Sequence, residues 1–222
     1  MSNVKKVKIK ICGIKNTGEA AYLNDAGVDY AGFVFHEKSK RNIEISKAKE
    51  IFKELNQNIK KVAVMVSPDA AKVRKLQQAG FDILQIHGNL SEEALAEARL
   101  PVWAAVNITD RVLLEEKLKA FDKLPEELLE KVRGIVVDSA EYGSGKPFLW
   151  NEDMRWQSGI FSGRKFILAG GLNAGNVQDG IRIFSPDVVD VSSGVEECME
   201  GYTGKSKNMI KEFTGKVKSY EQ

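Results

Sequence analysis

The sequence VKIKICG, at residues 7–13, alternates basic and β-branched side chains and then reaches a cysteine and a glycine. An alternation with a period of two is typical of a β-strand, because successive side chains point to opposite faces. Lys10 and Cys12 therefore share one face, and the isoleucines share the other. Since Gly13 lets the backbone turn at once, the thiol of Cys12 is predicted to end the strand.

The same kind of segment recurs along the chain. After a first strand at 7–11, the apolar segments are 31–35, 61–66, 83–86, 102–106, 134–137, 165–169 and 188–192. Helical patterns lie between them, so the chain reads as repeated βα units with parallel strands. Eight units predict a closed (β/α)8 TIM barrel, formed as a single domain by residues 1–222. An open doubly wound sheet is the alternative, but the first turn lacks the glycine fingerprint of that fold.

Capping signals place the connecting helices. Thr17 is the expected cap of the first helix, which stops at Gly27, and Ser46 is expected to open the second. Asn173, after a double glycine, is expected to begin the last helix before the eighth strand. The other predicted helices occupy 67–80, a stretch from 91 onward, 110–121 and 125–132.

Composition restricts the classes of partner. Apolar residues make up 43% of the chain and charged residues 29%, as in an ordinary globular protein. A net charge of +2 gives no reason to expect nucleic acid or an anionic membrane surface as partner. We expect neither a membrane span nor a signal peptide, because no apolar run is suitable. Two cysteines are too few for a disulfide scaffold, so a cytoplasmic location is predicted.

Polar residues gather where the predicted strands end. In a (β/α)8 barrel these carboxyl ends form the mouth that carries the active site. The residues expected at this mouth are Cys12, Arg41, Gln85, His87, Asp138, Gly170, Gly171, Asn173, Ser192, Ser193 and Gly194. Because the strands behind them are apolar, the sequence predicts a ligand site at one end of the barrel.

Six groups of motifs resemble, in order, those of the phosphoribosylanthranilate isomerase family. They are KICGI at 10–14, GFVF at 32–35 with KSKR at 38–41, QIHG at 85–88, VDS at 137–139 with GSGK at 143–146, LAGGLN at 168–173 and VDVSSGV at 189–195. The resemblance implies an Amadori rearrangement in tryptophan biosynthesis. In that reaction N-(5-phosphoribosyl)anthranilate becomes 1-(2-carboxyphenylamino)-1-deoxyribulose 5-phosphate. The chemistry needs no redox step, cofactor or metal.

The resemblance implies that Cys12 is the general base and Asp138 the general acid. The acid opens the sugar by protonating the ring oxygen, and the base removes the proton from C2. A free thiol has a pKa near 8.5, so Cys12 needs a cationic neighbour to be a thiolate at neutral pH. Asp138 must stay protonated, which burial favours. Taken singly, the alternatives are a buried structural cysteine and a helix cap.

A phosphate site is predicted in the loops after the seventh and eighth strands. Glycines there allow close approach of the backbone, and the following helix offers N–H groups to an anion. The residues concerned are Gly170, Gly171, Asn173, Ser192, Ser193 and Gly194. The alternative is a pair of tight turns with caps.

The remaining substrate contacts are implied by the same resemblance. Arg41 could bind the anthranilate carboxylate, because a guanidinium matches a carboxylate bidentately; the alternative is a solvated basic loop. Gln85 and His87 lie at alternate positions of their strand, on the face expected to point into the barrel, although His87 could be a core histidine with its hydrogen bonds satisfied. Gly143 and Gly145 belong to a mobile loop over the site in the family interpretation, or to a flexible connection.

Lys10 and Asp190 are predicted to form a buried ion pair. Both have inward parity on the first and eighth strands, which are neighbours in a closed barrel, and neither charge would be tolerated alone. The pair could help to hold Cys12 as a thiolate. Cys198 is expected in a loop, from which it could approach Cys12.

Two rival functions stay open at this point. Another sugar-phosphate isomerase on the same barrel, such as the histidine-pathway enzyme, is expected to carry an aspartate in place of Cys12. A non-catalytic barrel that binds phosphorylated ligands would tolerate loss of the thiol. The expected partner is a small molecule, a phosphorylated aminoribose with an anthranilate group, and the protein is expected to be a monomer or a homodimer.

Overall fold

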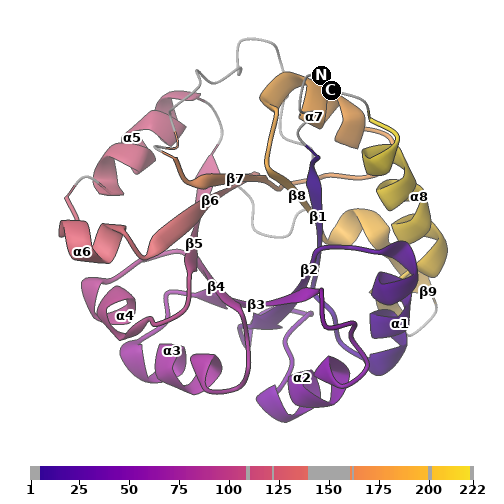
Figure 1. The fold of residues 1–222 in the computed structure, drawn as a ribbon, viewed down its shortest axis with the longest axis horizontal. Coiled ribbons are helices and arrows are strands. Elements are labelled where there is room, and N and C mark those ends of the chain that lie inside the picture. The colour runs from indigo at the N-terminus through magenta and orange to yellow at the C-terminus, as the bar shows by residue number, and fades with distance from the viewer. Residues whose placement is uncertain are drawn as a thin grey trace.

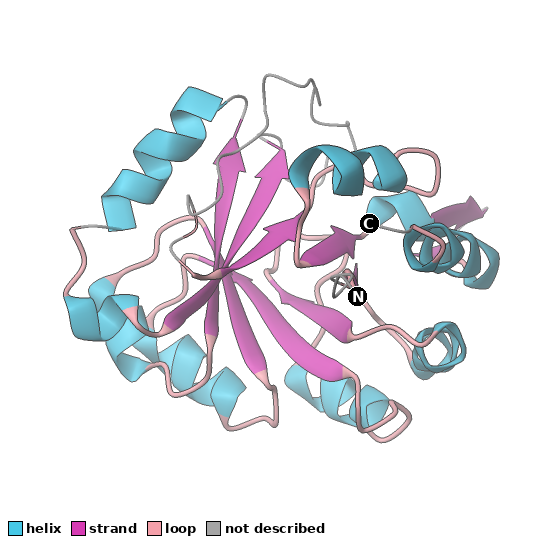
Figure 2. Ribbon diagram, turned by 45° about the horizontal axis from the view of Figure 1, so that its top comes forward, coloured by secondary structure: helices cyan, strands magenta, loops and turns pink. Residues whose placement is uncertain are grey.

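The chain forms a closed barrel of eight strands. A computed structural model describes residues 6–108, 111–121, 123–139, 161, 163–199 and 202–220. Within this part of the chain, the strands follow one another around the ring in sequence order, and neighbouring strands are parallel. Helices surround the ring on the outside (Figures 1 and 2). The predicted (β/α)8 TIM barrel is therefore confirmed.

The eight barrel strands lie close to the predicted segments. Their bounds are β1 Lys8–Cys12, β2 Tyr30–Phe35, β3 Lys60–Val66, β4 Ile83–His87, β5 Val102–Ile108, β6 Val132–Ser139, β7 Lys165–Leu168 and β8 Val188–Val191. The described helices are α1 Thr17–Ala26, α2 Ile45–Phe52, α3 Ala70–Gln77, α4 Glu92–Glu97, α5 Arg111–Phe121, α6 Glu126–Leu129, α7 Val177–Phe184 and α8 Lys207–Lys218. None of these helices is long and apolar enough to cross a bilayer.

The barrel closes between β1 and β8, where Lys10 is the register partner of Asp190. Alternation along the strands then divides the core into two parts. Outward side chains such as Ile9 and Ile11 are buried beneath the helices, whereas Tyr30 and Trp103 fill the barrel interior. The rings of Tyr30 and Trp103 meet edge to face with centroids 5.0 Å apart. Large side chains thus fill the part of the interior away from the carboxyl ends of the strands, and the ligand cavity lies at those ends.

Two helix starts differ from the prediction by one residue. Asn16, not Thr17, caps α1, because its side-chain oxygen accepts a hydrogen bond from the backbone N–H of Glu19 at 2.9 Å. The second helix begins at Ile45, and the N-cap before it makes no side-chain hydrogen bond. Ser46 is therefore the second residue of α2 and not its cap. The backbone N–H of Ala48 donates to the carbonyl of Glu44 at 3.0 Å and closes the first turn.

The start predicted at Asn173 is wrong, because α7 begins at Val177. The side-chain oxygen of Asn173 accepts from the N–H of Gly175 at 2.8 Å and stabilises a turn before the helix. The N–H of Val177 then bonds to the carbonyl of Asn173 at 3.1 Å. Asn173 therefore shapes the turn, and its position is not the first residue of the helix.

A two-stranded hairpin between β8 and α8 was not predicted. Its strands, β9 Glu196–Met199 and β10 Tyr202–Lys205, are antiparallel and lie outside the barrel sheet. Their short polar sequences lack the apolar alternation that signals a strand. Cys198 thus belongs to a strand and not to a loop, while its side chain lies outside the described residues; its approach to Cys12 stays a prediction.

Candidate active site at the barrel mouth

A cavity of about 670 Å³ opens at the carboxyl ends of the strands. Most of the predicted site residues line it. Those that do are Cys12, Arg41, Gln85, His87, Asp138, Gly170, Gly171, Ser192 and Ser193. Asn173 and Gly194 lie outside the lining, and Gly143 and Gly145 lie outside the described residues. The lining also includes His36, Lys38, Ser39 and Lys40.

The thiol of Cys12 has room because the neighbouring strand carries a glycine. Cys12 is the last residue of β1, and its register partner on β2 is Gly32. A Cβ atom on Gly32 would lie 2.8 Å from the sulfur of Cys12 and 3.1 Å from the ammonium of Lys10. Any larger residue at this position would displace one of these groups.

Lys10 and Asp190 form the predicted ion pair. Lys10 Nζ lies 2.7 Å from Asp190 Oδ2, and both side chains are buried. Burial alone would lower the pKa of Lys10, but the charge and hydrogen-bond interactions with Asp190 and Cys12 together outweigh burial and raise the pKa above its ordinary value. The other carboxylate oxygen, Oδ1, has no hydrogen-bond partner among the described residues, and Asp190 lines the cavity. A buried charge pair thus supports the bottom of the site.

Burial raises the pKa of the Cys12 thiol above its ordinary value. The positive charges of Lys10 and Lys205 and a hydrogen bond with Lys10 act in the opposite direction, whereas Asp190 adds to the increase. The cationic neighbours required by the sequence argument are therefore present, but they do not outweigh burial. Cys12 is therefore less ionised at neutral pH than a free thiol, and its role as the general base stays a prediction.

Gln85 and His87 point into the interior from β4, as their parity predicted. Gln85 Nε2 lies 2.9 Å from His87 Nε2. Burial, with a smaller contribution from Lys10, lowers the pKa of His87 to about 4, so the imidazole is neutral at pH 7. Because an amide nitrogen only donates, the imidazole nitrogen accepts this hydrogen bond. Gln85 Oε1 has no partner among the residues the structure describes.

Arg41 is buried and paired, so it is not a residue of a solvated basic loop. Its guanidinium donates through Nε to Glu196 Oε1 at 2.6 Å and through Nη2 to Glu196 Oε2 at 2.8 Å. Although burial alone would raise it, hydrogen bonds and positive charge from Arg41 and Lys205 lower the pKa of Glu196 to about 2. Sequence reasoning missed Glu196, although it follows directly after the SSGV motif.

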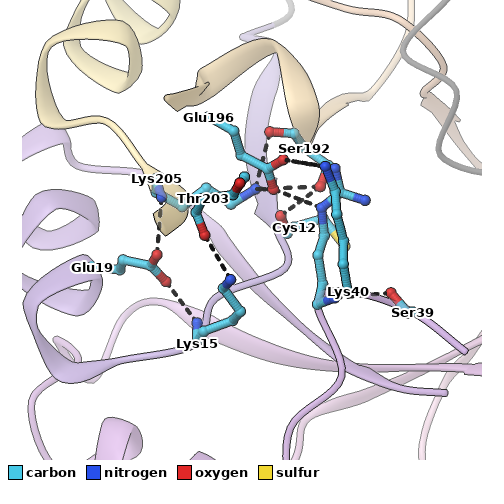
Figure 3. A network of polar contacts seen from close by, with 10 residues as sticks. Cys12, Lys15, Glu19, Ser39, Lys40, Ser192, Glu196, Thr203 and Lys205 are labelled. Carbon is cyan, nitrogen blue, oxygen red and sulfur yellow. Dashed lines mark hydrogen bonds and ion pairs between the residues drawn. The ribbon is translucent and has the colours of Figure 1, made fainter. Parts of the chain in front are cut away.

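The hairpin delivers a second buried cation, Lys205, to the same network (Figure 3). Its ammonium donates to Glu196 Oε1 at 2.9 Å and to the carbonyl of Ser192 at 3.0 Å. The hydroxyl of Ser192 in turn donates to the carbonyl of Cys12 at 2.9 Å. Glu19 accepts from the N–H of Lys205 at 2.9 Å and ties the hairpin to α1. Lys205 was also missed, because no local pattern marks a hairpin residue as buried.

The loops after β7 and β8, the second of which adjoins β1 in the ring, form another part of the cavity wall. Gly170 and Gly171 have positive φ angles of 84° and 69°. At Gly194, a Cβ atom would lie only 1.9 Å from the carbonyl oxygen of Leu172, so the two loops touch through their backbones. This close, glycine-rich backbone has the character of an anion cradle. Asn173 is exposed, and its expected N–H contribution at a helix start does not arise, because α7 begins later.

Among the described residues, no group of three or more His, Cys, Asp or Glu side chains is arranged to hold a metal ion. The cavity does hold proton donors and acceptors: a thiol at the end of β1, a carboxyl near the end of β6 and the charged groups around them. With its ligand cavity at the carboxyl mouth, the molecule has the architecture of a (β/α)8-barrel enzyme.

Comparison with known proteins narrows this class. The family model described as N-(5'phosphoribosyl)anthranilate (PRA) isomerase matches residues 9–216. The chain belongs to this family.

Individual relatives are similar to this chain over almost its whole length. An N-(5'-phosphoribosyl)anthranilate isomerase from Thermoanaerobacter sp. (strain X514) is 38% identical over 218 residues, which cover 96% of this chain and 98% of the relative. The phosphoribosyl anthranilate isomerase structure from Thermotoga maritima has a TM-score of 0.80 and 32% identity, covering 96% and 98%. A structure of the isomerase with reduced 1-(o-carboxyphenylamino)-1-deoxyribulose 5-phosphate has a TM-score of 0.74 and 31% identity, with the same coverage.

Proposed function

We propose that the protein catalyses the Amadori rearrangement of N-(5'-phosphoribosyl)anthranilate in tryptophan biosynthesis. The observation that carries the proposal is that Cys12 and Asp138, from strands far apart in the chain, line one cavity together with the glycine-rich loops after β7 and β8. An acid, a base and an anion cradle around one space are what a sugar-phosphate isomerase requires. Family membership supports the choice of substrate.

The proposed reaction consists of two proton transfers. Asp138 gives its proton to the ribose ring oxygen, the bond between that oxygen and C1 breaks, and the anilino nitrogen stabilises C1 as an iminium. The thiolate of Cys12 then removes the proton from C2, and the electron pair of that C–H bond forms the enolamine. Tautomerisation of the enolamine yields the ketone product. No electron leaves the substrate, so the step needs no oxidant.

The cavity offers a place for each end of the substrate. Backbone at Gly170 and Gly171, with the hydroxyl of Ser193, would hold the phosphate. Gly194, whose backbone touches the carbonyl of Leu172, and Ser192, whose hydroxyl donates to the carbonyl of Cys12, stay predicted phosphate contacts. Arg41 would bind the anthranilate carboxylate. Contacts by Gln85 and His87 are part of the same proposal, and those by Asn173, Gly143 and Gly145 stay predictions from the sequence.

Cys12 must lose its proton before it can act as a base. Lys10 and Lys205 are the groups whose positive charge favours the thiolate. Burial and the charge of Asp190 oppose it, and together they leave the pKa of the thiol raised. The proposed cycle begins with transfer of the Cys12 proton to solvent water, so that the thiolate is present when the proton of C2 is removed.

The test is turnover of N-(5'-phosphoribosyl)anthranilate by the parent protein, Cys12→Ala and Asp138→Asn. General acid–base groups typically contribute about 10²–10⁴-fold, so each variant is expected to lose activity by that factor. Cys198→Ala is the matched control for the loss of a thiol and should retain parent turnover. Circular dichroism confirms that each variant is folded.

Two alternative outcomes point elsewhere. A parent protein that ignores this substrate but isomerises a related aminoaldose phosphate would be another sugar-phosphate isomerase. A parent that binds phosphorylated ligands without turning any over would be a non-catalytic barrel. Full activity in Cys12→Ala would refute the assigned base. A cytoplasmic location and a monomeric or homodimeric state remain predictions.

A further inference from the structure

We propose that Glu196 is a positioning residue, which fixes the guanidinium of Arg41 so that one edge faces the carboxylate of the substrate. The inference rests on the proposed function and adds to it a residue that reaches the substrate only through Arg41. Without Glu196, the long side chain of Arg41 could adopt many rotamers, and the carboxylate would have to order it on binding.

A guanidinium has two edges that can each bind a carboxylate with two parallel hydrogen bonds. Glu196 occupies one of them, which consists of Nε and one hydrogen of Nη2, at 2.6 Å and 2.8 Å. The other edge consists of Nη1 and the second hydrogen of Nη2. No described residue bonds to Nη1, and Arg41 lines the cavity. The side chain is thus held by one carboxylate while a second edge remains for another.

Glu196 is itself fixed on both sides. Lys205 donates to Oε1 at 2.9 Å, and this ammonium is almost completely buried, with 1% of the side chain exposed. Only 6% of the Glu196 side chain is exposed. The nearby exposed Lys40 adds a longer contact of 3.7 Å. Two buried cations therefore keep the carboxylate ionised and immobile, which a surface ion pair could not do.

The stem of Arg41 also lies against the turn that follows the thiol. A Cβ atom on Gly13 would be 2.5 Å from Arg41 Cδ, so the stem packs directly on this glycine. Gly13 follows Cys12, and Arg41 is close enough to the thiol to interact with it electrostatically. Glu196 therefore sets the position of Arg41 relative to the proposed base, and through the bound carboxylate it sets the position of the sugar relative to Cys12.

The test compares Glu196→Gln with the parent on two compounds. One is N-(5'-phosphoribosyl)anthranilate, and the other is the same compound made with aniline, which lacks the carboxylate. Glutamine keeps the size of the side chain, but its NH2 group cannot accept from the guanidinium. KM for the anthranilate compound is expected to rise about tenfold or more, with a smaller change in kcat. KM, or Ki, for the aniline compound should stay at the parent value.

Glu197→Gln is the matched control. Glu197 is the next residue of β9, is exposed, and accepts from the hydroxyl of Ser206 instead of contacting Arg41. This control should keep the parent KM for both compounds. If Glu196→Gln fails to fold, Glu196→Asp is measured in its place, because it keeps the charge but withdraws the carboxylate from the guanidinium; KM should then rise for the anthranilate compound alone.

Two results would overturn the inference. An unchanged KM for both compounds would mean that Glu196 does not position Arg41 for binding. An equal increase for both would mean that Glu196 supports the site without regard to the carboxylate. Failure of the proposed function is distinct from these results, because the parent itself would then not turn over the anthranilate compound.

Discussion

The two sides of the cavity are built from different materials. The side formed by the loops after β7 and β8 consists largely of backbone. Gly194, in the second loop, packs directly on the carbonyl of Leu172 in the first. The side formed by β1, the loop after β2 and the hairpin consists of buried charged side chains, with Lys10, Arg41 and Lys205 paired to carboxylates. A backbone cradle suits a phosphate of fixed geometry, whereas a charged network can adjust the protonation and position of reacting groups.

Breaking the charged side should have the largest effect on stability. Replacement of Lys10 by methionine leaves Asp190 buried and unpaired at the barrel centre, which typically costs about 3–5 kcal/mol. The free energy of unfolding in urea measures this loss. Lys8→Met is the control on the same strand, because Lys8 is exposed and its ammonium lies 5.8 Å from the Tyr30 ring; it should cost about 1 kcal/mol or less. Equal losses in the two variants would contradict the role of the ion pair.

The same contrast explains what the sequence could predict. The barrel followed from repeated apolar segments, and the Lys10–Asp190 pair followed from parity along two strands that a closed ring makes neighbours. The glycines after β7 were found because their motif is local. In each case the signal lies within a few residues, or in a rule that holds for the whole fold.

The charged network could not be predicted in this way. Arg41 and Glu196 are separated by 155 positions, and the hairpin that carries Glu196 and Lys205 has no strand signal. Alternation along a strand also gives no measure of burial, so the sequence could indicate a cationic neighbour of Cys12 but could not show that burial raises the pKa of the thiol in spite of it. Interactions between distant, irregular segments have no local pattern, and only the assembled structure reveals them.

Breaking the backbone side should impair binding more than stability. A methyl group at Gly194 would collide with the carbonyl of Leu172, so the two loops must separate. We expect Gly194→Ala to weaken inhibition by reduced 1-(o-carboxyphenylamino)-1-deoxyribulose 5-phosphate about tenfold, since a small displacement of binding groups is costly. Gly215→Ala is the control, because a Cβ there would meet no atom within 4 Å. If both variants show the parent Ki, the loops do not form the phosphate site.

The smallest effect concerns the ionisation of Cys12. It compares the thiol in the charged side of the cavity with a free thiol in water. Because its pKa is raised, less thiolate exists at pH 7 than for a free thiol, and the thiolate fraction should keep rising beyond the pH at which a free thiol levels off. The rate of alkylation by iodoacetamide, followed by peptide mass spectrometry between pH 6 and pH 10, measures this fraction. A profile that levels off near pH 7 would indicate a lowered pKa and contradict the burial argument.

Ligand protection of Cys12 tests most directly whether the thiol and the phosphate cradle flank the same substrate. Alkylation of Cys12 is measured with and without saturating reduced 1-(o-carboxyphenylamino)-1-deoxyribulose 5-phosphate, at a pH where the thiol reacts. We expect the bound analogue to slow alkylation of Cys12 at least about tenfold, while inorganic phosphate, which fills only the cradle, should protect less. An unchanged rate of Cys12 alkylation with the analogue bound would contradict it.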